Sequence, residues 1–270
     1  MDLLMKLTPA DVRRILSVEG SAHVEVESKW KLDADQAKPL RKHLRERVDL
    51  ERVKNTVFFD QYLDTERLDL LRAGASLRLR YRKNGTHVYL QYKGPGLRQE
   101  GLHIRSEHRS RRLDALVSEE SACDVMRFTT PSVRDILRDK APDEMVDAMR
   151  RDLGPAAIAA IDRATLLCQY QKDVFRIELD GARLSPSVDR LSVFRVEGRG
   201  PLALSTFWEY ENQADADDLE GLLAAVPALK AFDETLAKTF ELRPEPLDKY
   251  RRCASGLLLP ARAEPVLAAI

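Results

Sequence analysis

Charged residues alternate with apolar ones in residues 23–32, and this period of two constrains the fold more than any other feature of the chain. Successive side chains of a β-strand point to opposite faces, so Glu25, Glu27 and Lys29 share one face of a strand. The other face carries Val24, Val26, Trp30 and Leu32. Two carboxylates about 6 to 7 Å apart on one strand face can reach a single hard divalent cation. A solvated amphipathic strand is the alternative interpretation, because charged outer faces are common on antiparallel sheets.

The same alternation recurs along the chain, with basic residues replacing the acidic ones in several places. In residues 76–82, Arg78 and Arg80 share one face while leucines occupy the other. The pair Asn84-Gly85 is a strong signal for a hairpin turn into the next strand. Further charged faces are expected in residues 86–93, 102–109, 175–180 and 207–211. Six strands should therefore carry ions on one side.

The whole chain is expected to form one α+β domain, with its core in residues 22–250. Strands are expected near residues 22–32, 55–63, 75–84, 86–94, 102–110, 164–171, 174–184 and 205–212. Helices are expected near residues 35–48, 112–121, 131–161 with breaks, and 215–238. Eight strands with mostly short connections favour an eight-stranded antiparallel β tunnel, a closed barrel with helices packed outside. Residues 113–162 are then a helical insertion, and residues 255–270 a C-terminal tail.

Composition narrows the possible partners. Forty-four basic residues balance forty-four acidic ones, so net charge favours neither a nucleic acid nor a membrane as partner. Residues 67–112 nevertheless contain twelve basic residues against only Asp69, Glu100 and Glu107, which makes a local anion-attracting block. The three cysteines form no CxxC pair, and no apolar run is long enough to span a bilayer. A cytoplasmic protein is expected.

Charged faces turned into a barrel require a particular kind of content. Arginines on one wall and glutamates on another would be very costly in a dry, empty lumen, because buried charges need partners. Arginine offers planar pairs of donors that suit phosphate oxygens, whereas Mg²⁺ prefers carboxylate, phosphate and water oxygens. The pattern therefore indicates a wet tunnel that holds a polyanion together with a cation.

Several motifs, in this order over residues 22–212, resemble the CYTH domain, the family of triphosphate tunnel metalloenzymes. They are Glu25-x-Glu27-x-Lys29, the run 59–65 (FDQYLDT), the run 70–80 (LLRAGASLRLR), Lys93-Gly94-Pro95 and a late Glu209-x-Glu211. Lys249-Tyr250 is similar to the closing lysine-tyrosine of the related polyphosphate-polymerase branch. The resemblance implies an eight-stranded antiparallel tunnel that acts on triphosphate compounds with Mg²⁺ or Mn²⁺.

Carried over residue by residue, the resemblance assigns the charged side chains to three roles. The metal ligands would be Glu25, Glu27, Glu209 and Glu211. Glu27 and Lys29 would take part in catalysis. The substrate would be held by Lys29, Arg78, Arg80, Lys93, Arg105, Arg176 and Lys249.

The expected function is hydrolysis of inorganic tripolyphosphate or an organic triphosphate, with a triphosphate or polyphosphate as the only expected ligand besides the metal. A class IV-like adenylate cyclase would use the same tunnel, but it needs a pocket for the base, and the sequence does not reveal one. A non-catalytic polyphosphate- or nucleotide-binding module is the third possibility. Four in-phase glutamates argue against it, because phosphate binding alone needs only basic residues.

Overall fold

The computed structural model describes residues 4–18, 24–48, 52–82, 88–113, 133–197 and 200–255. The expected turn at Asn84-Gly85, nearly all of the expected helix 112–121 and the tail after residue 255 lie outside these ranges. The other expected strands and helices can be compared with the structure directly.

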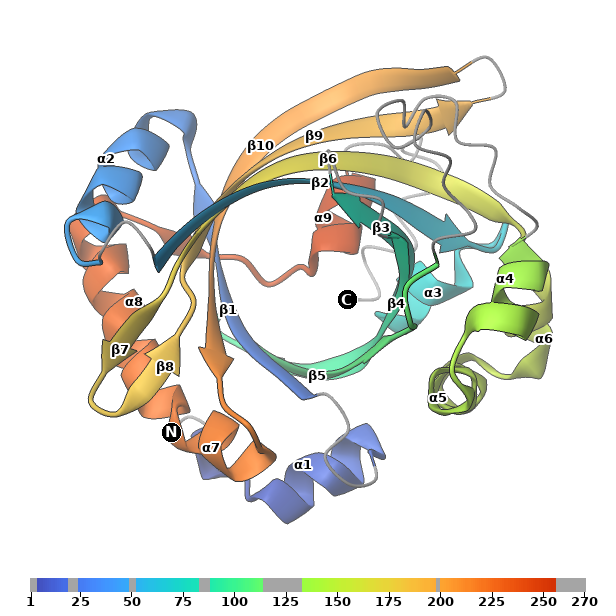
Figure 1. Cartoon of the computed structure of the whole chain (residues 1–270), viewed down its shortest axis with the longest axis horizontal. Helices are drawn as coiled ribbons and strands as arrows, with labels where there is room; N and C mark the ends of the chain where they lie inside the picture. The colour runs from blue at the N-terminus through green and yellow to red at the C-terminus, as the bar shows by residue number, and fades with distance from the viewer. Residues whose placement is uncertain are drawn as a thin grey trace.

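Eight antiparallel strands close into a barrel, as the alternating pattern predicts (Figure 1). Their order around the wall is β1-β5-β4-β3-β2-β6-β9-β10, and pairing of β10 with β1 closes the circle. The barrel strands are β1 (Val24–Leu32), β2 (Val53–Asp64), β3 (Ser76–Arg82), β4 (Val88–Gln99), β5 (Leu102–Arg109), β6 (Arg163–Phe175), β9 (Ser187–Glu197) and β10 (Gly200–Asp215). The α+β tunnel with helices outside is therefore confirmed.

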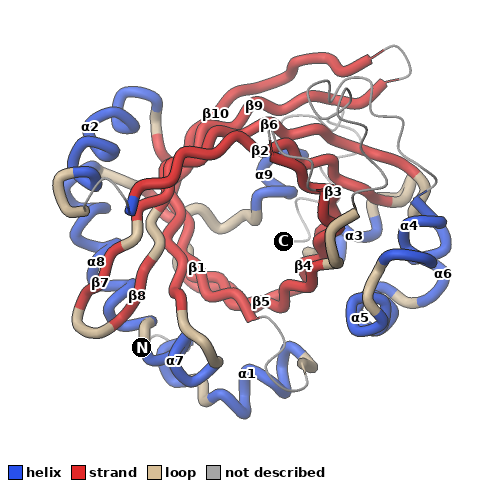
Figure 2. The backbone as a smooth tube through the Cα atoms, viewed as in Figure 1, coloured by secondary structure: helices blue, strands red, loops and turns tan. Residues whose placement is uncertain are grey.

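Helices cover the outer wall of the barrel, where the apolar side of each strand needs a partner (Figure 2). On one side, Ile136 of α4 and Met145 of α5 pack on Leu77 and Leu90 of the wall. Helices α1, α7 and α8 cover β1 and β5, and α2 packs near Leu32. The helices are α1 (Pro9–Leu16), α2 (Ala34–Arg45), α3 (Asp69–Ala73), α4 (Val133–Lys140), α5 (Asp143–Leu153), α6 (Pro155–Ala160), α7 (Leu219–Ala224), α8 (Val226–Phe240) and α9 (Lys249–Ser255), with a 3₁₀ turn, η1 (Leu4–Lys6).

The expected strand 174–184 is wrong. Strand β6 ends at Phe175, and the short hairpin β7 (Ile177–Leu179) and β8 (Ala182–Leu184) follows. Asp180 and Gly181 form its turn with φ of 51° and 77°, which is the Asp-Gly signal of a tight hairpin. The barrel strand that takes this place is β9, which the sequence interpretation missed. One expected helix, 215–238, is likewise two helices, because Pro227 opens a second helix immediately after α7.

Helix α9 closes one end of the barrel. Its Tyr250 stacks on Tyr62 of β2 with ring centroids 4.6 Å apart, and Cys253 packs on Cys168 of β6. The chain reaches α9 through the short strand β11 (Arg243–Pro244), which pairs with β1. Asp64 fastens this end, because its carboxylate accepts hydrogen bonds from the Leu70 and Leu71 amides and from the Tyr250 hydroxyl. Helix α9 therefore fills this end of the barrel.

Candidate functional site

The lumen contains a cavity of about 360 Å³, and most of the residues that line it have charged side chains. Because alternate residues of each strand point inward, side chains from several strands meet in one space. Ten cationic residues line the cavity: Lys29, Lys54, Arg78, Arg80, Lys93, Arg105, Arg109, Lys172, Arg176 and Lys249. The acids that line it are Glu25, Glu27, Glu107 and Glu211. This excess of cations would attract a polyanion.

A cluster of three carboxylates lies at the closed end. Oxygen atoms of Asp189, Glu209 and Glu211 lie within 4.8 Å of one another, and all three residues are buried. Lys249 of α9 enters this cluster, with its ammonium 2.8 Å from Asp189 Oδ2 and 2.7 Å from Glu209 Oε1. Lys172 of β6 lies 2.8 Å from Glu211 Oε2. Two lysines from different elements therefore compensate the acidic cluster.

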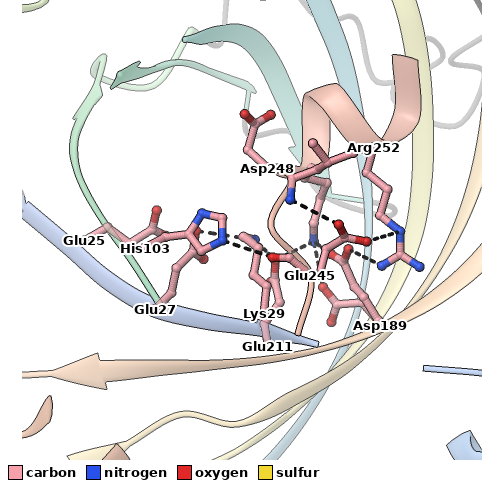
Figure 3. Close-up of polar contacts among 12 residues, drawn as sticks. Glu25, Glu27, Lys29, His103, Asp189, Glu211, Glu245, Asp248 and Arg252 are labelled. Atoms are coloured by element: carbon pink, nitrogen blue, oxygen red, sulfur yellow. Dashed lines mark hydrogen bonds and ion pairs between the residues drawn. The ribbon is translucent and has the colours of Figure 1, made fainter. Parts of the chain in front are cut away.

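Lys29 connects this cluster to the acids of β1. Its ammonium donates to Glu211 Oε1 and lies 3.3 Å from Glu27 Oε1 (Figure 3). On the other side of Glu27, Arg105 donates to Glu27 Oε1 at 2.5 Å and to Glu25 Oε2 at 3.0 Å. The strand register explains this contact, because Glu25 is paired with Arg105 across the β1–β5 ladder. The contacts thus alternate in charge from Glu211 to Lys29, Glu27, Arg105 and Glu25.

Lys93 completes the pairing of the β1 acids. Its ammonium lies 2.5 Å from Glu25 Oε2 and 3.0 Å from Glu107 Oε2. Burial raises the pKa of Glu25, but Lys93 and Arg105 outweigh it, so that the pKa stays below its ordinary value. For Glu107 the same competition, won by Lys93 and Arg78, lowers the pKa to about 2. These acids are therefore ionised at neutral pH.

Two arginines of β3 share one buried aspartate. Asp60 of β2, which is fully buried, accepts a hydrogen bond from Arg78 at 3.0 Å and two from Arg80 at 2.8 Å each. Arg80 also donates to the Tyr170 hydroxyl and lies over the Phe58 ring, 4.9 Å from its centroid. Arg78 donates to Gln91 at 3.1 Å. Asp60 thereby holds both guanidinium groups at the cavity wall.

The two glutamates of β10 differ in their protonation equilibria. Burial raises the pKa of both, but the pKa of Glu211 ends well below its ordinary value because Lys172, Lys249 and Lys29 surround it. The pKa of Glu209 stays raised, because burial and the neighbouring Glu211 charge outweigh Lys249. Burial lowers the pKa of Lys29, but Glu211 and Glu27 together raise it above its usual range. Lys29 is therefore a permanent cation at the centre of the site.

Comparison with known proteins identifies the architecture. The family model described as CYTH domain matches residues 23–196. The chain belongs to the CYTH domain family. The CYTH match runs from β1 into β9, and Glu209, Glu211 and Lys249 lie beyond it.

Solved structures share the CYTH fold at low sequence identity. A putative adenylyl cyclase from Hippeastrum, with a dominant triphosphatase activity, matches with a TM-score of 0.59 and 17% identity, over 87% of this chain and 98% of that one. A putative adenylate cyclase from Bacillus halodurans matches with a TM-score of 0.51 and 16% identity, over 86% and 98% of the two chains. No curated protein matches the chain. In the described part of this CYTH protein, no helix has the length and apolar character needed to cross a membrane.

All of the sequence-predicted site residues except Glu209 line this cavity. Glu25, Glu27, Lys29, Arg78, Arg80, Lys93, Arg105, Glu211 and Lys249 line the cavity. Glu209 is fully buried against Lys249 and Arg252, in the carboxylate cluster with Asp189 and Glu211. Arg176 lies just after β6, exposed and at the edge of the cavity. The four glutamates are divided in two pairs, and Lys29 bridges them.

Four further residues of the site were not assigned a role from the sequence. Asp60 belongs to a quoted motif, and only its contacts reveal that it holds Arg78 and Arg80. Asp189 was missed with β9, whose inward residues change from Asp189 to Leu191 and Val193 where α9 fills the barrel. Lys172 lies one residue beyond the expected strand 164–171. Arg252 lies on α9, a helix that was not expected, and donates to Glu209.

The carboxylate cluster has the chemistry of a metal site. Three oxygen donors close together suit a hard divalent cation such as Mg²⁺ or Mn²⁺. Among the described residues, the buried Asp189 Oδ1 has no hydrogen-bond partner, which leaves a lone pair free for a ligand. The residues present therefore fit a metal ion, and in this structure Lys249, Lys172 and Lys29 lie against the three carboxylates.

Proposed function

We propose that this CYTH protein is a metal-dependent triphosphatase that hydrolyses inorganic tripolyphosphate or an organic triphosphate inside the barrel. The observation that carries the proposal is the cavity lining, ten cations and four acids with a buried carboxylate cluster at the closed end. Ions of both signs in one enclosed space need a ligand that is itself a polyanion accompanied by a cation.

The basic side chains would hold the phosphates. Arg78, Arg80 and Arg105 offer planar pairs of donors to phosphate oxygens, and Lys93 acts as a point charge beside them. Each of these groups is already fixed by a carboxylate or amide partner, so little rotamer entropy is lost when a phosphate binds. Lys249 would contact the end of the phosphate chain that lies nearest α9, and the exposed Arg176 the opposite end.

Glu27 and Lys29 would act on the reacting phosphate. Glu27 would hold a water molecule whose oxygen attacks the terminal phosphorus, and it would take up the proton as the bridging P–O bond breaks. The electron pair of that bond leaves with the rest of the phosphate chain. Burial and Glu25 raise the pKa of Glu27, yet Lys29 and Arg105 keep it low, so this glutamate is a weak base. A loose phosphoryl-transfer transition state needs mainly positioning and charge neutralisation, which this lumen supplies.

The proposed metal is Mg²⁺ or Mn²⁺, held by Glu25, Glu27, Glu209 and Glu211 together with Asp189. When bound, it would neutralise the phosphate oxygens and orient the chain. Lys29 lies between the two glutamate pairs and would remain a cation beside the phosphate. The free thiols of Cys168 and Cys253, 3.9 Å apart without a disulfide, suit a reducing compartment, and we include the cytoplasm in the proposal.

Phosphate release tests the proposal. The protein is incubated with tripolyphosphate, ATP or thiamine triphosphate, with Mg²⁺, with Mn²⁺ or with a chelator, and both inorganic phosphate and cyclic AMP are measured. We expect phosphate release that requires the metal and no cyclic AMP. Cyclic AMP as the main product from ATP would favour a cyclase. Tight binding of all three compounds with no product would leave a binding module.

A further inference from the structure

A buried aspartate lies directly behind the candidate site, on the outer side of the barrel wall. Asp233 of α8 is 1% exposed, and three side chains donate to its carboxylate. The Tyr210 hydroxyl lies 2.7 Å from Oδ1, the Asn212 amide nitrogen lies 2.9 Å from Oδ1, and the Ser28 hydroxyl donates to Oδ2. Each oxygen of this carboxylate is therefore satisfied by a side chain of the barrel wall.

The donors all come from the seam where the barrel closes. Ser28 belongs to β1, Tyr210 and Asn212 belong to β10, and the two strands pair with Ser28 opposite Asn212. A single carboxylate thus joins both strands of the closing pair. Helix α8 also packs on this part of the wall through Leu229 and Leu236.

The residues of the candidate site alternate with these donors along the same strands. Ser28 lies between Glu27 and Lys29, and Tyr210 lies between Glu209 and Glu211. Neighbouring side chains of a strand share one backbone and point to opposite faces. A shift of any donor toward or away from α8 therefore also moves the charged side chain next to it, which faces the lumen. Lys29 and Glu211, which face each other across the seam, are also in direct contact.

We infer that Asp233 is a positioning residue for the metal site, which sets the register and spacing of β1 against β10 and hence the distance between the two glutamate pairs. The inference rests on the proposed metal-dependent function, but it concerns metal binding and can be tested without turnover. Burying a carboxylate costs free energy unless it is hydrogen-bonded, and a core leucine would stabilise a purely structural contact at lower cost. Partners that hydrogen-bond directly to metal ligands typically change metal affinity 10- to 100-fold when they are substituted, and Asp233 lies one step further away, behind the strands that carry the ligands.

The test compares Asp233→Asn with Leu236→Ala. Both change buried positions of α8, but Leu236 makes only apolar contacts in the described cluster around α2 and β10. Mn²⁺ affinity is measured by electron paramagnetic resonance at pH 8, with and without tripolyphosphate, and the free energy of unfolding is measured for each variant. We expect Asp233→Asn to weaken Mn²⁺ binding by about tenfold, the lower end of the range for direct partners of metal ligands. We expect Leu236→Ala to lose stability while it keeps the wild-type Mn²⁺ affinity.

A milder variant keeps the test informative if Asp233→Asn does not fold. Tyr210→Phe removes one donor to Asp233 and preserves the ring, so it should fold and weaken Mn²⁺ binding in the same direction by a smaller factor. A loss of Mn²⁺ affinity in Leu236→Ala equal to that in the seam variants, or no loss in the seam variants, would overturn the inference. A wild-type protein that binds Mn²⁺ with this dependence on Asp233 but releases no phosphate would overturn the proposed hydrolysis and support the positioning role.

Discussion

Replacement of Arg78 by alanine should weaken substrate binding while it leaves the barrel folded. Arg78 is 5% exposed, and it donates to Asp60 at 3.0 Å and to Gln91 at 3.1 Å. Asp60 keeps both of its bonds from Arg80 when Arg78 is removed, so no buried carboxylate loses its last partner. A charge-assisted hydrogen bond is worth about 1.5 to 3 kcal/mol, which corresponds to a roughly 10- to 150-fold weaker complex.

The assay is isothermal calorimetry of tripolyphosphate binding in Ca²⁺, chosen to slow turnover, with Arg190→Ala as the matched control. Arg190 is an exposed arginine of β9 that stacks over Trp208 on the outside of the wall. Its removal lowers the net charge equally but should leave the dissociation constant within about twofold, because exposed charges are strongly screened. Equal dissociation constants for the two variants would place Arg78 outside the binding site and refute the reasoning.

Three further predictions follow from the same geometry. Glu211→Gln should abolish metal-dependent phosphate release with an unchanged circular dichroism spectrum, and full activity would exclude Glu211 as a ligand. Burial lowers the pKa of His103 to about 4, below its unfolded value, so the stability that neutral His103 contributes is lost as pH drops from 6.5 toward 4. In urea titrations, the stability difference between wild type and His103→Gln should change by about 2 kcal/mol between pH 7 and 5, and an unchanged difference would refute the assignment. Tripolyphosphate should exceed pyrophosphate roughly a hundredfold in kcat/KM, and equal rates would count against a tunnel.

The barrel could be predicted from the sequence because its inner face is unusually regular. Charged side chains at alternate positions of β1, β3 and β5 indicate which side of each strand faces the polar lumen. The apolar residues between them indicate which side the helices cover. The period of two does not depend on distant contacts, so it is visible without a structure. The charged residues chosen on that basis, with the exception of Glu209, line one cavity.

The missed elements are those in which the inner face is not uniformly polar. Strand β9 turns Asp189 toward the ions and Leu191 toward α9, so its pattern is neither charged nor apolar throughout. That change depends on α9, which arrives more than fifty residues later in the chain and has only seven residues. Asp60, Lys172 and Arg252 became assignable only from their partners, because a single charge on a strand or helix is usually solvated.

Diffraction from crystals soaked with Mn²⁺ and a non-hydrolysable imido analogue of tripolyphosphate would test the central claim most directly. We predict an anomalous manganese peak in the lumen within coordination distance of Glu211 and the analogue. We also predict phosphate oxygens within hydrogen-bond distance of Arg78 and Arg80. Manganese only on exposed carboxylates, with the analogue outside the barrel, would contradict the claim that this lumen binds a triphosphate together with a metal.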